Sequence, residues 1–210
     1  MDTEFDYTAH VFRSPKFRSV VEEAVGFFAQ TPLQLLPPHT RFVGGGVYAL
    51  YYLGENELYA ELSELNRRDC THPLYVGKAV PPGWRTGRTR LSTTPDSYQR
   101  LREHTRSLRQ TENLRVGDFQ CRFVIFNDVE SDLIVPVEAS LIRHHKPLWN
   151  MVVDGFGNHD PGKGRYNQAK SEWDVLHPGR LWAERLTGVA PELNEIIANV
   201  KSHLESLGFS

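Results

Sequence analysis

Three short apolar runs, each bounded by glycine, proline or polar residues, dominate the hydrophobic pattern of this chain. They are GGGVYALYYL at residues 44–53, PLYVGKA at residues 73–79 and FQCRFVIF at residues 119–126. Valine, tyrosine, phenylalanine and isoleucine are typical of the pleated, partly buried surface of a sheet. The pattern therefore predicts three β-strands, and it leaves open whether the third lies at the centre or at the edge of the sheet.

Elsewhere, apolar residues recur at intervals of three and four, which is the period of a helix with one buried face. Leu58, Leu62 and Leu65 follow this spacing between the first two strands, where their helix would be an insertion. Asp96 is placed to cap the helix that follows it. Helices are expected at residues 15–30, 55–68, 97–110, 135–146 and 190–207.

Two segments lack an apolar period. Residues 83–90 (GWRTGRTR) combine glycines with arginines and predict a basic loop. Residues 147–168 are rich in glycine, asparagine and aspartate and predict a long irregular segment. Because no repeat or linker divides the 210 residues, we expect a single α+β domain over residues 1–210.

The formal net charge of -2 hides an uneven distribution of charge. Eight basic and two acidic side chains fall between Lys78 and Arg109, so a polyanion is expected to bind the middle of the chain. The acidic N-terminus lacks the pattern of a signal peptide and no window is long enough to span a membrane, so we expect a cytoplasmic protein. Cys70 and Cys121 are far apart and belong to no metal-ligand pattern.

Arg100 and His104 are candidates for chemistry on the helix expected at residues 97–110. They are four residues apart, so their side chains leave the same face of the helix, one turn from each other. Leu101 and Leu108 are expected on another face. A solvated basic surface with a chance histidine is the alternative interpretation of the pair.

Glu138 and Asn150 are two further polar candidates. Glu138 lies among apolar residues of a predicted helix, where a carboxylate is costly to bury unless a cation or metal accompanies it. It could equally be a glutamate at the edge of the core, paired with one arginine. Asn150 follows Pro-Leu-Trp just past the helix end, where asparagine is common as a turn residue.

The order of these features resembles the GIY-YIG nuclease superfamily. Gly-Val-Tyr, Tyr-Val-Gly, an arginine with a histidine one turn on, a glutamate in an apolar helix and Pro-Leu-Trp-Asn follow one another along residues 44–150. Valine replaces isoleucine in both short motifs, and an inserted helix occupies residues 54–72. The resemblance implies a small three-stranded antiparallel sheet flanked by helices, with an N-terminal helical arm at residues 1–43 and a C-terminal extension at residues 151–210.

The resemblance also implies a set of catalytic residues. Tyr48 would be the general base toward water, although a phenol with a pKa near ~10 needs help from His104, Arg100 and a metal. Arg100 would bind phosphate oxygens, and Glu138 would hold one divalent cation per active site, Mg²⁺. The division of roles among the remaining members stays open. The complete set is Tyr48, Tyr75, Arg100, His104, Glu138 and Asn150.

Short GIY-YIG chains with a helical insertion and terminal extensions look like type II restriction endonucleases, which cut palindromic duplex DNA as homodimers. The branch that this chain resembles cuts CCGCGG, and arginine is suited to reading its guanines. Lys78 could contact the phosphate or be an ordinary lysine at a strand end, and each other candidate could hold a phosphate without reading a base. The candidate DNA contacts are Lys78, Arg85, Arg88, Arg90, Lys163, Arg165, Asn167 and Gln168.

Two predicted helices are candidates for the contact between two copies of the chain. The N-terminal helix and the inserted helix could form the dimer contact, or either could simply cover the sheet. Two other functions stay open: a DNA-binding protein that keeps the fold without cutting, and a monomeric repair or structure-selective nuclease. An intact set of two tyrosines, an arginine and a glutamate weighs against pure binding, because binding alone needs no carboxylate beside a phosphate.

Overall fold

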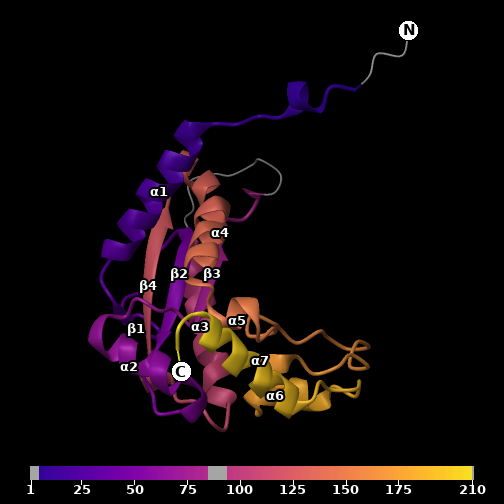
Figure 1. Cartoon of the computed structure of the whole chain (residues 1–210). Coiled ribbons are helices and arrows are strands. Elements are labelled where there is room, and N and C mark those ends of the chain that lie inside the picture. The colour runs from indigo at the N-terminus through magenta and orange to yellow at the C-terminus, as the bar shows by residue number, and fades with distance from the viewer. Residues whose placement is uncertain (1–4, 85–93, 210) are drawn as a thin grey trace.

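The computed structural model describes residues 5–84 and 94–209 (Figure 1). Its strands are β1 (Gln34–Leu35), β2 (Gly45–Tyr52), β3 (Tyr75–Ala79) and β4 (Phe119–Phe126). Its helices are α1 (Pro15–Gln30), α2 (Ala60–Asp69), α3 (Asp96–Gln110), α4 (Ile134–His145), α5 (Leu148–Met151), α6 (Glu172–Leu176) and α7 (Leu193–Ser206). The protein therefore has an α+β fold, with each expected strand and each expected longer helix present.

The sheet has four strands in the order β1-β4-β2-β3, and all neighbours are antiparallel. The prediction of three strands is wrong because β1 adds a pair of residues along β4, where Gln34 lies opposite Cys121. A two-residue strand has no hydrophobic alternation of its own, so only the neighbouring strand reveals it. Strand β4 is internal, between β1 and β2, and β3 is an edge strand.

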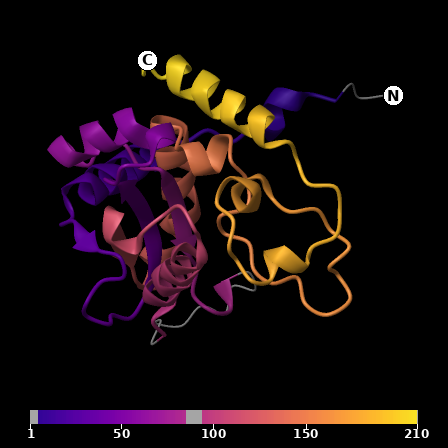
Figure 2. The ribbon, with the colours of Figure 1, turned by 90° about the horizontal axis from the view of Figure 1, so that it is seen from below.

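Strand β2 is buried along its whole length because elements cover both faces of the sheet. Its even-numbered residues from position 48 onward belong to a core cluster with Leu101 of α3 and Trp173 of α6. Its odd-numbered residues from position 47 onward belong to a second cluster with Val21 of α1 and Val137 of α4. Figure 2 shows the C-terminal extension gathered as loops and short helices on one side of the sheet, with α7 running beside them.

Helix α3 begins one residue earlier than expected. Pro95 is its N-cap, and Asp96 is its first helical residue. The prediction that Asp96 is the N-cap is therefore wrong, and its carboxylate accepts a hydrogen bond from Thr94 Oγ1 at 2.8 Å. An acidic residue in the first turn still interacts favourably with the positive end of the helix dipole.

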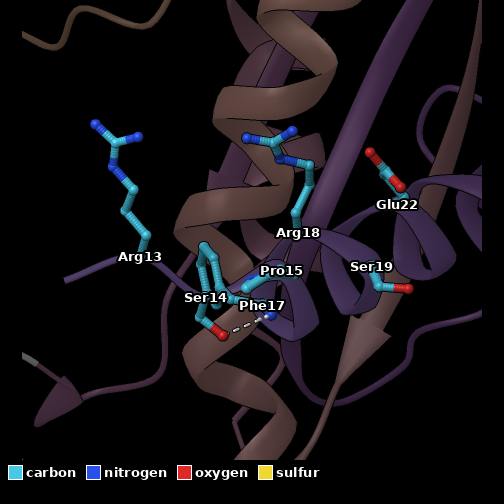
Figure 3. A pocket seen from close by; sticks show the side chains of 7 residues that line it. All are labelled: Arg13, Ser14, Pro15, Phe17, Arg18, Ser19 and Glu22. Atoms are coloured by element: carbon cyan, nitrogen blue, oxygen red, sulfur yellow. Dashed lines mark hydrogen bonds between the residues drawn. The ribbon is translucent and has the colours of Figure 1, made fainter.

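Residues 5–14, which precede α1, extend away from the sheet (Figure 1) and are called the arm from here on. Ser14 caps α1 by accepting a hydrogen bond from the Phe17 backbone at 3.2 Å, beside a shallow hollow where Arg13 and Arg18 project to the same side (Figure 3). Phe5, Tyr7 and Phe12 of the arm are 72%, 70% and 89% exposed. None of the helices within residues 5–84 and 94–209 is long and apolar enough to cross a bilayer.

Candidate active site

Strands β2 and β3 bring the two motif tyrosines to the same face of the sheet. Tyr48 lies directly opposite Gly77, which follows Tyr75 by two residues on β3. The rings of Tyr48 and Tyr75 are 6.4 Å apart between centroids. A Cβ atom on Gly77 would lie 2.6 Å from Tyr48 Oη, a distance that real Cβ atoms do not adopt. The glycine of Tyr-Val-Gly therefore makes room for the phenol of Gly-Val-Tyr.

His104 of α3 is the hydrogen-bond partner of Tyr48. The Tyr48 hydroxyl and His104 Nε2 are 2.8 Å apart, and both side chains are buried. His104 shares its buried stripe with Leu101 and Leu108, so the expectation that these leucines lie on another face is wrong. The three positions are spaced by three and four residues, which is the spacing of one helical face.

Burial keeps both members of this pair neutral in the free protein. It raises the pKa of Tyr48 well above its usual value, with a contribution from the neighbouring Tyr75, while the Arg100 guanidinium opposes the rise. Burial also lowers the pKa of His104 well below its usual value. Arg100 carries only hydrogen-bond donors, so the Tyr48 oxygen accepts from it, and with the His104 tautomer that leaves Nε2 unprotonated the phenol donates to the imidazole.

Arg100 lies one turn before His104 on α3, and the side chains of Glu103 and His159 hold its guanidinium. Arg100 Nη1 donates to Glu103 Oε2 at 2.6 Å and contacts His159 Nε2 at 2.6 Å. Its positive charge acts against the burial that raises the pKa of Tyr75 to about 12. The arginine fork is thus aimed beside both phenols, in a position suited to an anionic ligand.

Glu138 of α4 approaches β3 from the other face of the sheet and pairs with Lys78. Its negative charge adds a small contribution to the raised pKa values of Tyr48 and Tyr75, for which burial is the largest cause. The Lys78 ammonium stands where a cation is expected, so Lys78 is a partner of the carboxylate and not an unpaired lysine at a strand end. Its proposed contact with a DNA phosphate stays a prediction.

The residues present fit a hydrated magnesium ion but not an ion enclosed by protein. The Glu138 side chain is 13% exposed and supplies one carboxylate. Among residues 5–84 and 94–209, no three His, Cys, Asp or Glu side chains converge on one point as a metal site. Mg²⁺ commonly keeps several waters and takes one or two carboxylates together with substrate phosphate oxygens, which matches this donor set.

Asn150, at the end of the family motif, faces the backbone of β3. Its side-chain oxygen accepts from the Val76 amide at 2.7 Å, and its side-chain nitrogen donates to the Val76 carbonyl at 2.8 Å. Both polar groups of the amide are thereby engaged one residue after Tyr75. In this structure Asn150 positions the strand that carries Tyr75, whereas its predicted catalytic role remains a prediction.

The candidate DNA contacts of the C-terminal extension are exposed on a braced loop. Tyr166 donates to Asp160 Oδ1 at 2.9 Å, and Arg185 donates to the same carboxylate at 2.8 Å. This loop begins beside His159 and carries Lys163, Arg165, Asn167 and Gln168. The other predicted base-reading loop, with Arg85, Arg88 and Arg90, lies outside the residues that the structure describes.

The C-terminal extension also supplies residues to the pocket that the sequence does not identify. Phe156 packs its ring on His104, and His159 contacts Arg100. The only signal in the sequence is the stretch Gly-Phe-Gly-Asn-His within a segment that reads as irregular. Contacts over about fifty residues of sequence separation carry no periodic signature, so neither residue could be assigned to the site from the pattern.

Comparison with known proteins gives one family. The restriction-endonuclease family model described as "Eco29kI GIY-YIG domain" matches residues 40–204. No curated protein gives a significant match to the chain. The matched residues include all the candidate catalytic side chains and most of the C-terminal extension, with both tyrosine motifs inside the match.

Proposed function

Because this chain belongs to the Eco29kI GIY-YIG family of restriction endonucleases, we propose that it is a type II enzyme that hydrolyses phosphodiester bonds in palindromic duplex DNA. The observation that supports a cutting function best is the buried hydrogen bond between Tyr48 and His104 beside the Arg100 guanidinium. A protein that only binds DNA has no use for a neutral phenol and a neutral imidazole arranged to relay a proton.

The proposed reaction starts with a water held by the Tyr75 hydroxyl. As the water attacks phosphorus, it gives a proton to the Tyr48 oxygen, and the Tyr48 proton passes to His104 Nε2. The new P–O bond forms while the bond to the leaving oxygen breaks on the opposite side, and solvent protonates the leaving oxygen. Arg100, exchanging Glu103 and His159 for two phosphate oxygens, stabilises the charge that develops on the phosphoryl group.

Magnesium has a limited place in this proposal. Glu138 would hold the ion, which supplies positive charge near the leaving oxygen when bound. Lys78 would then leave the carboxylate and become available to a phosphate, since one cation replaces the other. This exchange would reconcile the ion pair of Lys78 and Glu138 with the expected DNA contact of Lys78.

The proposed substrate is the GC-rich palindrome CCGCGG, which is taken from the family resemblance. Arginine offers two parallel donors to guanine O6 and N7, and Arg165 is exposed on the braced loop that starts at Asp160. Two copies would match the two-fold symmetry of the palindrome, with one active site for each strand. The exposed aromatic side chains Phe5, Tyr7 and Phe12 are the proposed contact between copies, because burying their rings would favour association.

Digestion of plasmid DNA with magnesium tests the proposed function. The parent should give discrete double-strand fragments, and Tyr48→Phe and Glu138→Gln should each lower the rate by about 100-fold or more while duplex binding persists. Tyr51→Phe is the matched control, because Tyr51 lies on the same strand but points to the opposite core. It should keep most of the parental rate.

Three outcomes would contradict the proposal in different ways. Binding without any cleavage would make the chain a DNA-binding protein on a nuclease fold. Nicking confined to lesions or junctions would make it a structure-selective nuclease. Parental cleavage by Tyr48→Phe would remove the general base from the mechanism while leaving the enzyme class intact.

A further inference from the structure

Phe156 forms a wall of the pocket that holds the Tyr48 and His104 pair. Its ring stacks on the His104 imidazole, with centroids 4.5 Å apart and planes inclined by 15°. It also meets Tyr75 edge-on at 4.9 Å and packs against the tilted ring of Trp149 at 4.6 Å, both measured between ring centroids. Phe156 is only 1% exposed, so the aromatic wall shields one face of the imidazole from water.

Arg180 holds the loop that carries Phe156. Its guanidinium donates to the carbonyl oxygens of Gly155 at 2.9 Å, Phe156 at 3.2 Å and Asn158 at 3.2 Å. Its Nε donates to Asp174 at 2.6 Å, and the group is 1% exposed. A buried charge is costly unless every donor is satisfied. Here three of the bonds go to carbonyls of the loop at residues 155–158, which specifies the backbone path into the pocket, and the fourth ties that loop to Asp174 of α6.

The rings of Trp173 and Trp182 also pack against the Arg180 guanidinium. They lie 4.5 Å and 4.7 Å from the Arg180 guanidinium carbon, measured to the ring centroids. This arrangement uses the planar shape of arginine, which a lysine ammonium cannot reproduce. Arg180, held between these two rings, therefore fixes the loop at residues 155–158 and with it the position of Phe156.

We propose that Phe156, fixed by Arg180, is a positioning residue that keeps the His104 ring turned toward Tyr48 and out of water. The proposal rests on the proposed function, since it concerns the proton relay of that reaction. Without the stacked ring, the imidazole gains room to rotate, and water can compete for Nε2. The phenol then loses the acceptor that makes it a base.

The charged and titratable groups around His104 come from three directions. Tyr48 and Tyr75 face it from the sheet, Arg100 lies one turn away on α3, and His159 and Arg180 approach from the C-terminal extension. Burial is the largest cause of its lowered pKa, and the positive charges add to the effect. Removing the wall should therefore let the pKa of His104 rise toward 6.5.

Phe156→Leu tests the proposal with two measurements. In NMR titration of the free protein, the His104 resonance, identified by its loss in His104→Asn, should titrate at a higher pH than in the parent. In single-turnover cleavage, the rate should fall about tenfold or more, and the acid limb of the pH profile should move to higher pH. The sign follows because only neutral His104 accepts the phenol proton, and a higher pKa leaves less of it neutral.

Two comparisons separate positioning from a loss of stability. Val200→Ala removes buried apolar volume from the same core cluster on α7, so it should lower the melting temperature without moving either titration. Arg180→Lys keeps the charge but cannot reach three carbonyls, so it should move both titrations in the direction of Phe156→Leu.

An unchanged His104 titration and pH profile in Phe156→Leu would overturn the inference. A parent that cuts no DNA would contradict the proposed function, and the titration of the free protein would then still show whether Phe156 holds His104.

Discussion

Tyr48 and His104 are both neutral and buried, so a proton cannot simply move from one to the other. Transfer within the pair alone would create a phenolate and an imidazolium in a poorly solvated site, which is unfavourable. The transfer becomes feasible when the phenol receives a proton from water as it gives one up, because its oxygen then never carries a full charge. The nearby Arg100 guanidinium further favours any charge that develops there.

Gly77→Ala should disrupt this pair without removing a polar group. The new Cβ would lie 2.6 Å from Tyr48 Oη, so the phenol must shift and its bond to His104 must lengthen. We expect cleavage to fall about 100-fold, as misplacing a catalytic group by about 1 Å commonly does. Stability should fall by about 1–3 kcal/mol from overpacking. Single-turnover cleavage and urea unfolding measure the two effects.

Gly117→Ala is the control for the glycine substitution. A Cβ at Gly117 meets nothing within 4 Å, so cleavage and stability should stay close to parental values. Parental cleavage by Gly77→Ala would show that the contact between the two motifs is not needed for the reaction.

At the level of single residues, the sequence predicts some contacts well and others not at all. The pair of Tyr48 and His104 follows from the motif order, because a strand and the helix packed on it place these positions face to face. The burial of His104 could also have been read from its spacing to Leu101 and Leu108. Phe156 and Arg180 could not be placed, because their partners are distant in sequence and their segment has no period.

Among the elements, β3 matters most to the site because it carries Tyr75 and Lys78. It is an edge strand of five residues, paired on one side with β2 only. The side chain of Asn150 compensates by bonding both polar groups of the Val76 backbone. The register that places Tyr75 beside Tyr48 thus depends on a residue from the start of α5.

Asn150→Ala should loosen β3. Two hydrogen bonds are lost, so the free energy of unfolding should fall by about 1–3 kcal/mol in urea titration. Asn113→Ala is matched, since Asn113 also makes two side-chain hydrogen bonds, to Leu176 and His177, away from β3. We expect a similar loss of stability in both variants and a much larger loss of cleavage in Asn150→Ala.

Two other results would change the role assigned to Asn150. If Asn150→Ala kept parental stability but lost cleavage, the side chain would act on the substrate directly, as the family resemblance implies. A loss of stability with unchanged cleavage would make it purely structural.

The sequence predicted the longer elements closely because their periods are clear. The strand at residues 119–126 and the helix at residues 15–30 have the expected bounds. Strand β1 and the short helices α5 and α6 were missed, since all three are too short for a period and are fixed by the elements beside them. The cap of α3 was misplaced by one residue because Pro95 and Asp96 are both acceptable at a helix start.

For the whole molecule, the exposed aromatic arm leads to a test of assembly. Tyr7→Ser combined with Phe12→Ser should weaken self-association at least tenfold, because both rings are largely exposed in the single chain and would be buried between copies. Sedimentation velocity measures the change. On plasmid, the variant should yield more nicked than linear product, since two sites no longer act together.

Val189→Ser is the control for the arm, because Val189 is 94% exposed in the C-terminal extension. It should sediment as the parent does. A parent that remains monomeric both alone and on DNA would contradict the proposed homodimer and favour a monomeric nuclease.

The aromatic wall that the C-terminal extension contributes has a consequence for engineering. The motifs end at Asn150, so a designer would be inclined to excise residues 44–150 as a portable cutting cassette and fuse it to another targeting module. Such a cassette would lack Phe156 and Arg180, and His104 would become exposed to solvent. Any chimaera built from this protein should retain the chain at least through Trp182, where the residues that enclose the guanidinium end.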